Sequence, residues 1–282
     1  DHSHVDPAYK KKVVKGVSAK VITVAMLGGD CYPATPIGIN LPNADWIRKE
    51  HGSKSVTIDN ITYAYDRAAH GNGFEEEFML RPEDRERIDK YGKIGDALHT
   101  DLHECLGHGS GQLLAGVSAD ALGSYGSTIE EARADLFGLY YIADAKLVEL
   151  GLVPDAEAYK SQYYTYMMNG LLTQLTRIQP GNEIEEAHMR NRALIARWTL
   201  KHYPSAVRLV KYDEKTYVEV SDYEMLREAF AKLLAEIQRI KSEGDFEAAK
   251  QLVEHYAIRV EPKLHEELLA RYKSLGIAPY KG

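Results

Sequence analysis

The residue pattern of this 282-residue chain changes near Gly73. Before that point, β-branched residues at 17–29 and 54–65 predict short strands, and the proline-rich stretch between them predicts an extended chain. After it the pattern favours helices, apart from a predicted hairpin at 207–220. The sequence therefore predicts a mainly α (α+β) fold, with a helical domain, a small strand-rich N-terminal part and one hairpin.

This pattern divides the chain into three predicted parts. Residues 1–70 form the strand-rich segment, residues 71–258 the helical domain, and residues 259–282 a C-terminal helix and tail that pack on the first part. The expected helices are 83–91, 95–109, 127–150, 155–178, 183–202, 223–242, 246–257 and 263–275.

Charge and composition exclude several classes of protein. The chain has 42 acidic and 35 basic residues and a formal net charge of −7, which argues against a nucleic-acid surface. No apolar run approaches the ~20 residues that span a bilayer. Cys31 and Cys105 are too few for a disulfide scaffold. With no signal sequence, we expect a cytoplasmic protein without membrane or nucleic-acid partners. Since the chain begins at Asp1 and not Met, we also expect a piece of a longer protein.

The strongest chemical signal is a histidine-rich segment at residues 99–111. It is similar to the zinc-binding helix His-Glu-x-x-His but has one extra residue, so His103 and His108 are five apart. On a regular α-helix this spacing separates them by about 140°, against about 40° for a spacing of four. A π-bulge would absorb the extra residue, and Gly107 would give the backbone the freedom to form it. We therefore predict that both histidines bind one zinc ion.

A catalytic zinc site needs about three protein ligands. Glu130 and Glu131 could each be the partner in a capping box, with Ser127 and Thr128. Glu131, however, shares a helix face with Asp135 and with apolar residues further on, and acids on such a face need partners or a metal. We predict Glu131 as the third ligand, with Glu130 and Asp135 orienting the imidazoles.

Rival assignments exist for neighbouring residues. His99 and His103 have the usual spacing of four but lack a Glu after the first histidine, so we expect His99 in a solvent or core role. Cys105 is a possible soft ligand, but it should point away from the ligand face as a small buried thiol. Cobalt or manganese would also suit imidazole and carboxylate ligands.

Glu104 directly follows the first predicted ligand. In metallopeptidase helices this position carries the general base, which takes a proton from the activated water and passes it to the leaving amine. We therefore predict Glu104 as a catalytic residue.

Two motifs resemble one family of peptidases. Residues 103–108 match the hexapeptide His-Glu-x-x-Gly-His of the dipeptidyl peptidase III metallopeptidases, and residues 130–135 are similar to that family's Glu-Glu-x-Arg-Ala-Glu/Asp. The cysteine in the first motif resembles bacterial members. The resemblance implies a two-lobed zinc exopeptidase that removes dipeptides from the N-termini of short peptides. A helical lobe holds the zinc, the other lobe has a β-rich core, and substrate lies between them.

The resemblance also implies roles for residues outside the two motifs. Asn40 and Asn43 would bind the substrate backbone on an added strand. His188 would stabilise the oxyanion, Arg192 would orient substrate, and Arg259 would bind a substrate carboxylate. Taken without the resemblance, the asparagines fit an ordinary loop, and the residues at 188 and 192 fit a polar helix face.

The chain departs from the family in two ways. It lacks the acidic, tyrosine-bearing segment that holds the substrate's free amine, and family members are much longer. We therefore expect the zinc-bearing C-terminal catalytic portion, with one Zn²⁺ per chain, short peptides as substrates and the missing N-terminal lobe as partner. Two alternatives remain open: a zinc-stabilised peptide-binding module without catalysis, and a metallopeptidase of other specificity.

Overall fold

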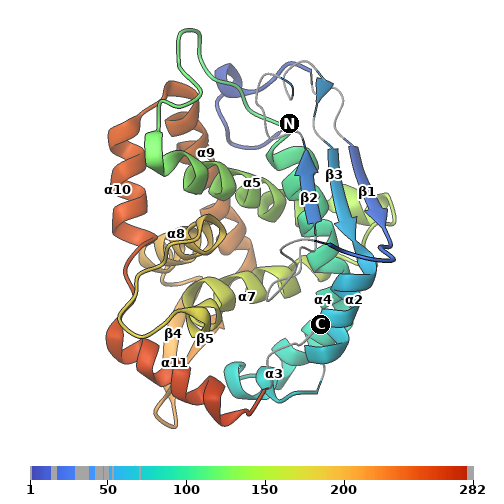
Figure 1. The fold of residues 1–282 in the computed structure, drawn as a ribbon, viewed down its shortest axis with the longest axis vertical. Helices are drawn as coiled ribbons and strands as arrows, with labels where there is room; N and C mark the ends of the chain where they lie inside the picture. Colours follow the sequence, from blue (N-terminus) through green and yellow to red (C-terminus); the bar gives the residue numbers. More distant parts are fainter. Residues whose placement is uncertain are drawn as a thin grey trace.

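Helices make up most of the chain, and a small three-stranded sheet lies along one side of them (Figure 1). This computed structural model describes residues 2–13, 18–28, 38–41, 47, 51–52, 54–69 and 71–277, without the side chains of 38–41 and 65–69. The arrangement confirms the predicted mainly α (α+β) fold with one hairpin. Its elements are η1 (Pro7–Tyr9), β1 (Ser18–Ile22), β2 (Gly38–Leu41), β3 (Lys54–Ile58), α2 (Asp59–Ala69), α3 (Phe74–Phe78), α4 (Pro82–Leu102), η2 (His103–Gly107), η3 (Gly123–Tyr125), α5 (Gly126–Ile142), α6 (Ala145–Glu149), α7 (Ala158–Leu171), η4 (Thr173–Arg177), α8 (Ala187–His202), β4 (Val207–Tyr212), β5 (Lys215–Val220), α9 (Tyr223–Glu243), α10 (Phe246–Tyr256) and α11 (Pro262–Ser274).

The three-stranded sheet has the order β1-β3-β2, with β1 parallel and β2 antiparallel to the central strand β3. The prediction of strand over residues 54–65 is wrong in its second half, because β3 ends at Ile58 and α2 begins at once. Asp59 supplies an acid in the first turn, which favours a helix N-terminus. The Asn60 side chain bonds both the N–H and the carbonyl of Val24, so it ties this turn to the segment after β1.

The two helices expected at 83–91 and 95–109 are one continuous element. α4 runs through Gly92 and Gly95 and passes directly into the π-helix η2. Both glycines lie where α4 packs against α7. A Cβ on Gly95 would meet the Gln162 side chain at 3.7 Å, and the nearest α7 atom to a Cβ on Gly92 would be Ser161 Oγ at 3.9 Å. Tertiary packing thus keeps helical a segment whose local propensity is poor.

Two other predicted helices end early. The helix expected at 127–150 stops at Ile142, and Asp144 starts the short helix α6 by accepting a hydrogen bond from the Lys146 N–H at 2.9 Å. The helix expected at 155–178 ends at Leu171 and continues as the 3₁₀ turn η4.

The predicted hairpin is present as β4 and β5, paired antiparallel from Val207–Val220 to Tyr212–Lys215. Asp213 and Glu214 form its two-residue turn with φ of 48° and 60°. Positive φ at both central residues is the geometry of a type I′ turn, which matches the twist of the flanking strands.

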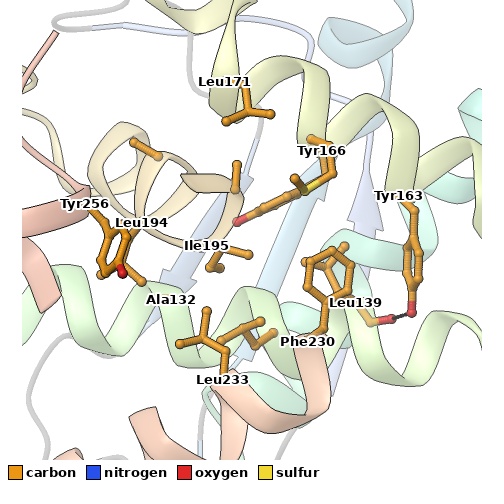
Figure 2. Packing of buried hydrophobic residues seen from close by; sticks show 14 of the residues in the cluster. Ala132, Leu139, Tyr163, Tyr166, Leu171, Leu194, Ile195, Phe230, Leu233 and Tyr256 are labelled. Carbon is orange, nitrogen blue, oxygen red and sulfur yellow. Dashed lines mark hydrogen bonds between the residues drawn. The ribbon is translucent and has the colours of Figure 1, made fainter. Parts of the chain in front are cut away.

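The main hydrophobic core lies among α5, α7, α8 and α9. Figure 2 shows Leu139, Tyr163, Leu194 and Phe230 within it, all at most 1% exposed. α5 is buried around most of its circumference, so this helix forms the centre of the unit.

The C-terminal helix α11 contacts the helical part of the chain. Arg271 bonds Glu77 of α3, His265 bonds carbonyls at the end of η4, and Tyr272 packs against Phe74. The described contacts therefore join α11 to residues 71–258, whereas the sequence suggested packing on residues 1–70. Among the described residues, no helix is both long and apolar enough to cross a bilayer.

Candidate metal centre

The extra residue between the two histidines is absorbed by a π-helix. Residues His103–Gly107 form η2, and the His108 N–H donates to the His103 carbonyl at 3.0 Å, five residues back. The imidazoles of His103 and His108 consequently lie edge to face, with ring centroids 4.7 Å apart. The predicted local bulge is therefore present, and it brings the two rings to one side of the helix.

Gly107 is required here for a different reason from the one predicted. Its φ lies outside the left-handed region, so the π-helix does not need glycine for its backbone angles. A Cβ on Gly107 would instead lie 2.6 Å from Ala134 Cα and 2.8 Å from Ala134 Cβ and O. The absent side chain lets η2 approach the backbone of α5, the helix that carries both glutamates.

Three potential ligand atoms converge between η2 and α5. Glu131 Oε2 lies 3.3 Å from His103 Nε2 and 3.6 Å from His108 Nε2, and the three side chains form a group whose ligand atoms are all within 4.8 Å of one another. Glu131 Oε2 is buried and has no hydrogen-bond donor within bonding geometry. A buried carboxylate oxygen without a donor is costly, and a cation would compensate it.

The outer nitrogens of both histidines face carboxylates. His103 Nδ1 lies 2.7 Å from Asp135 Oδ1, and His108 Nδ1 lies 2.7 Å from Glu130 Oε1. An ionised carboxylate only accepts, so each Nδ1 carries a proton, and Nε2 is the nitrogen of each ring that faces Glu131 and is left for a second proton or a metal ion. The sequence predicted Glu130 and Asp135 for this position.

The capping-box alternative for the two glutamates is wrong. α5 begins at Gly126 with Tyr125 as its N-cap and has no side-chain cap, so Ser127 and Thr128 already lie inside the helix. The Glu130 carboxylate is held by the Arg133 guanidinium at 2.8 Å and by the Lys241 ammonium of α9.

These cations keep Glu130 ionised. Burial alone would raise the pKa of Glu130, but Arg133 and Lys241 lower it well below the ordinary value of 4.5. Arg133 is itself 2% exposed and also donates to the Ser110 carbonyl at 3.2 Å. Sequence reasoning assigned no role to Arg133, although its position one turn after Glu130 was a usable signal. Lys241 lies 111 residues after Glu130, so the sequence gave no signal for their contact.

Electrostatics at the ligand atoms favour a positive charge. Burial alone would lower the pKa of His103, but Asp135 and Glu131 raise it from 6.5 to about 10. Burial alone would raise the pKa of Glu131, but polar contacts with His103 and His108 lower it to about 2. The same carboxylates that favour a proton on the imidazole would favour a metal cation in its place.

A second group of possible ligands overlaps the first. His99 is 7% exposed, in the predicted core role, and its Nε2 lies 3.2 Å from Asp135 Oδ1, so the rings of His99 and His103 share one carboxylate oxygen. Both Asp135 oxygens accept hydrogen bonds, because Tyr166 Oη donates to Oδ2 at 2.7 Å. Glu131 Oε2 has no donor, so the group formed with His108 is the better candidate metal centre.

Glu104 follows the first ligand within η2 and is half-buried. Its charge adds to burial in raising the pKa of Asp101, one turn earlier. Cys105 is half-buried, less than predicted, and burial raises the pKa of its thiol. A thiol that holds its proton is a poor metal ligand.

The predicted substrate residues of α8 lie on the same side as the metal candidates. His188 is exposed, and its Nδ1 lies 3.5 Å from Glu131 Oε2. Glu186 caps α8 by accepting from the N–H groups of His188 and Met189, both at 2.9 Å, which fixes the first turn. Arg192 is half-buried one turn later, and its charge acts on Tyr166.

The remaining predicted substrate residues have less structural support. Arg259 is exposed in the segment between α10 and α11. In Figure 1, α10 lies on the side of the ribbon away from the sheet. Among described residues, no contact joins its side chain to the histidine group. Asn40 lies in β2, an edge strand, with its backbone opposite Ser55. Asn43 lies outside the described residues.

Comparison with known proteins identifies the family. The sequence profile of peptidase family M49 matches residues 27–122 and 117–271. The chain belongs to peptidase family M49. Mouse dipeptidyl peptidase 3 is 26% identical over 263 residues, which covers 79% of this chain and 35% of that protein. The predicted membership of the dipeptidyl peptidase III family is thus confirmed.

Solved structures of family M49 share the fold. The dipeptidyl peptidase III of Caldithrix abyssi aligns with a TM-score of 0.72 and 26% identity, over 97% of this chain and 49% of that one. The enzyme of Corallococcus sp. strain EGB aligns with a TM-score of 0.66 and 26% identity, over 87% and 42%. This chain therefore spans about half of the solved relatives and about a third of the mouse protein.

Proposed function

We propose that this chain is the zinc-bearing catalytic part of a metallo-exopeptidase that releases dipeptides from peptide N-termini. The observation that carries the proposal is the convergence of His103 Nε2, His108 Nε2 and the donorless Glu131 Oε2. Family membership supports a metallopeptidase role, and the names of the relatives support dipeptide release.

The three side chains fit a zinc ion. Zinc binds imidazole nitrogen and carboxylate oxygen at about 2.0–2.2 Å in tetrahedral geometry, which separates neighbouring ligand atoms by about 3.4 Å. The separations of 3.3 and 3.6 Å from Glu131 Oε2 agree with this value. Three protein ligands leave one position open, as in catalytic zinc sites. A zinc ion held there would supply Lewis-acid activation of a water molecule and of the scissile carbonyl.

Glu104 and His188 would handle the proton and the developing charge. The Glu104 carboxylate follows the ligand His103 directly, and we assign it to take a proton from water and deliver it to the leaving amine. His188 presents Nδ1 near Glu131 from an exposed position, and we assign it to stabilise the oxyanion. The capped first turn of α8 would hold His188 in place.

Substrate binding would use the edge of the sheet. β2 pairs only with β3 among the described strands, so its other edge can accept an extended peptide by backbone hydrogen bonds. Asn40 and Asn43 would add side-chain hydrogen bonds to the peptide. Arg192 and Arg259 would bind polar groups of the substrate. Recognition of the free amine would fall to the lobe that this chain lacks relative to the family.

The metal assignment is tested by elemental analysis of the purified chain and of His108→Ala. We expect about one zinc per chain, and loss of it in the variant. Zinc retained by His108→Ala, or a chain that binds no zinc under non-chelating conditions, would contradict the assignment.

The catalytic assignment is tested in the complete protein with Glu104→Ala. We expect the variant to keep its zinc and lose dipeptide release, because water would have no proton acceptor. Glu86→Ala, which removes an exposed acid of α4, is the matched control and should remain active. Turnover retained in Glu104→Ala would refute the role of Glu104, and peptide binding without cleavage by the unmodified protein would identify a binding module. Internal fragments as products would indicate another specificity.

A further inference from the structure

Asp135 is bonded to three buried side chains through both of its carboxylate oxygens. Its Oδ1 lies 2.7 Å from His103 Nδ1 and 3.2 Å from His99 Nε2, and its Oδ2 accepts from Tyr166 Oη at 2.7 Å. Asp135, His99 and Tyr166 are all buried, and they come from α5, α4 and α7. Of these three bonds, only the one with His103 has a role in the proposed function.

The terminal torsion of an aspartate is soft, so one hydrogen bond would not fix the plane of its carboxylate. Here both oxygens are held, with His99 on the oxygen that His103 uses and Tyr166 on the other. Rotation of the carboxylate would break at least one of these charge-assisted bonds in a buried site. The pair therefore defines where the acceptor for His103 Nδ1 lies, and with it the direction of Nε2.

Packing alone does not account for an imidazole at position 99. His99 Nδ1 is buried and has no hydrogen-bond partner, a cost that an apolar side chain of similar size would avoid. Gly138 leaves room for the ring, since a Cβ there would lie 3.0 Å from His99 Nδ1 and Cε1, closer than ordinary van der Waals contact. The fold thus accommodates a ring with one unpaired nitrogen while its other nitrogen faces Asp135.

Tyr166 is directed at Asp135, whereas the neighbouring buried tyrosine of the same helix is not. Its side chain projects from α7 into the packed interior, and Tyr163 projects from the same helix one turn earlier (Figure 2). Both phenols are buried, but Tyr163 donates to the Leu139 carbonyl at 2.8 Å, away from the metal centre. Burial and the Asp135 charge both favour the protonated phenol of Tyr166, so it is a donor to the carboxylate.

We propose that His99 and Tyr166 are positioning residues for the metal centre, which clamp the two Asp135 oxygens and thereby hold His103 in its ligand orientation. This inference rests on the proposed function, in which His103 binds the metal through Nε2. Removing a direct hydrogen-bond partner of a metal ligand typically weakens metal binding by about 10–100-fold, and His99 and Tyr166 act through one such partner, Asp135.

The test measures zinc affinity of the 282-residue chain by competition with a chromophoric chelator. Tyr166→Phe deletes one hydroxyl, and His99→Leu replaces the ring with an apolar side chain. We expect each to weaken zinc binding by about tenfold or more. His99→Gln can place its amide N–H near the position of Nε2, and we expect it to stay within about threefold of the unmodified chain.

Tyr163→Phe is the matched control, because it removes a buried hydroxyl and a hydrogen bond from the same helix without touching Asp135. We expect it to lower thermal stability and leave zinc affinity unchanged. A second readout is the visible spectrum of the Co²⁺-loaded chain, which reports ligand geometry. Tyr166→Phe and His99→Leu should alter the spectrum, whereas Tyr163→Phe and His99→Gln should not.

The outcomes separate this inference from the function on which it rests. The positioning role alone would be overturned if Tyr166→Phe and His99→Leu had the same zinc affinity and Co²⁺ spectrum as Tyr163→Phe. Zinc binding unaffected by His108→Ala would overturn the metal assignment, and the positioning role with it. Should His99→Leu fail to fold, Tyr166→Phe still decides, since it removes a single oxygen atom.

Discussion

Gly107 is the position at which a single added carbon should disturb the metal centre most. In Gly107→Ala the new Cβ would lie 2.6 Å from Ala134 Cα and 2.8 Å from its carbonyl oxygen. Ordinary contact needs about 3.5 Å or more, so η2 and α5 would have to separate by about 1 Å. Both contacting groups are backbone atoms within helices, which cannot move aside as a flexible side chain would.

The magnitude follows from two opposing terms. Overpacking of this kind costs about 1–3 kcal/mol, and replacing a helical glycine by alanine returns about 0.5–1 kcal/mol. With mid-range values for both, the net loss is about 1 kcal/mol, which corresponds to a fall of roughly 2–4 °C in Tm for a chain of this size. Because η2 and its C-cap residue provide His103 and His108 while α5 carries Glu131, the same displacement should weaken zinc binding by at least about tenfold.

Gly95→Ala is the matched control on the preceding helix. Its Cβ would meet Gln162 at 3.7 Å, an ordinary van der Waals distance, so the alanine should be neutral or stabilising. The assay is thermal unfolding of the chain and of both variants without metal, followed by zinc titration. If Gly107→Ala matched Gly95→Ala in both Tm and zinc affinity, close approach of the helices would not be the reason for glycine at 107.

Three further predictions concern stability. Burial alone would raise the pKa values of Glu77 and Glu267, but the hydrogen bonds that they accept lower both values below 4.5. Arg271, which is 5% exposed, donates to both carboxylates. Their contribution to stability is therefore present above pH 4.5 and lost as the pH falls through the lowered values. Arg271→Met should cost about 3 kcal/mol at neutral pH and flatten the acid limb of Tm between roughly pH 6 and 3; an unchanged limb would contradict this. A chelator should lower the Tm of the zinc-loaded chain by roughly 8–16 °C, because zinc at about 1,000 times its Kd adds about 4 kcal/mol to the free energy of unfolding. An equal Tm with and without chelator would argue against a zinc site that exists only in the folded state. Glu214→Gly should raise Tm, because φ at this turn position is 60° and glycine adopts it without the cost of about 1 kcal/mol that other residues incur; a fall in Tm would count against the assigned turn.

Local pattern located most elements but not their ends. The long amphipathic helices α9, α10 and α11 lie within one or two residues of prediction, because their apolar periodicity and N-caps are local signals. The errors occurred where contacts between distant segments override local propensity. α4 continues through two glycines because it packs on α7, and α2 begins where a strand was expected because Asn60 is bonded to Val24.

In the candidate site, too, some features follow from the local sequence and others depend on tertiary contacts. Its ligand types and the π-bulge follow from the sequence alone, because His103, Gly107 and His108 are neighbours in the chain and their spacing leaves few backbone solutions. Family motifs likewise pointed to Glu131, which the fold brings to both imidazoles.

Tertiary structure decided what holds those ligands in place. Asp135 is bonded by side chains of α4 and α7, and Glu130 by Lys241 of α9, across as many as 111 residues of sequence. Gly107 matters through its contact with Ala134, not through its own backbone freedom. A hydrogen bond depends on atoms meeting within about 3 Å, and the packing of four helices sets that distance. Sequence thus determined which candidate ligands this chain carries, and helix packing determined how their side chains are oriented and which charged groups lie beside them.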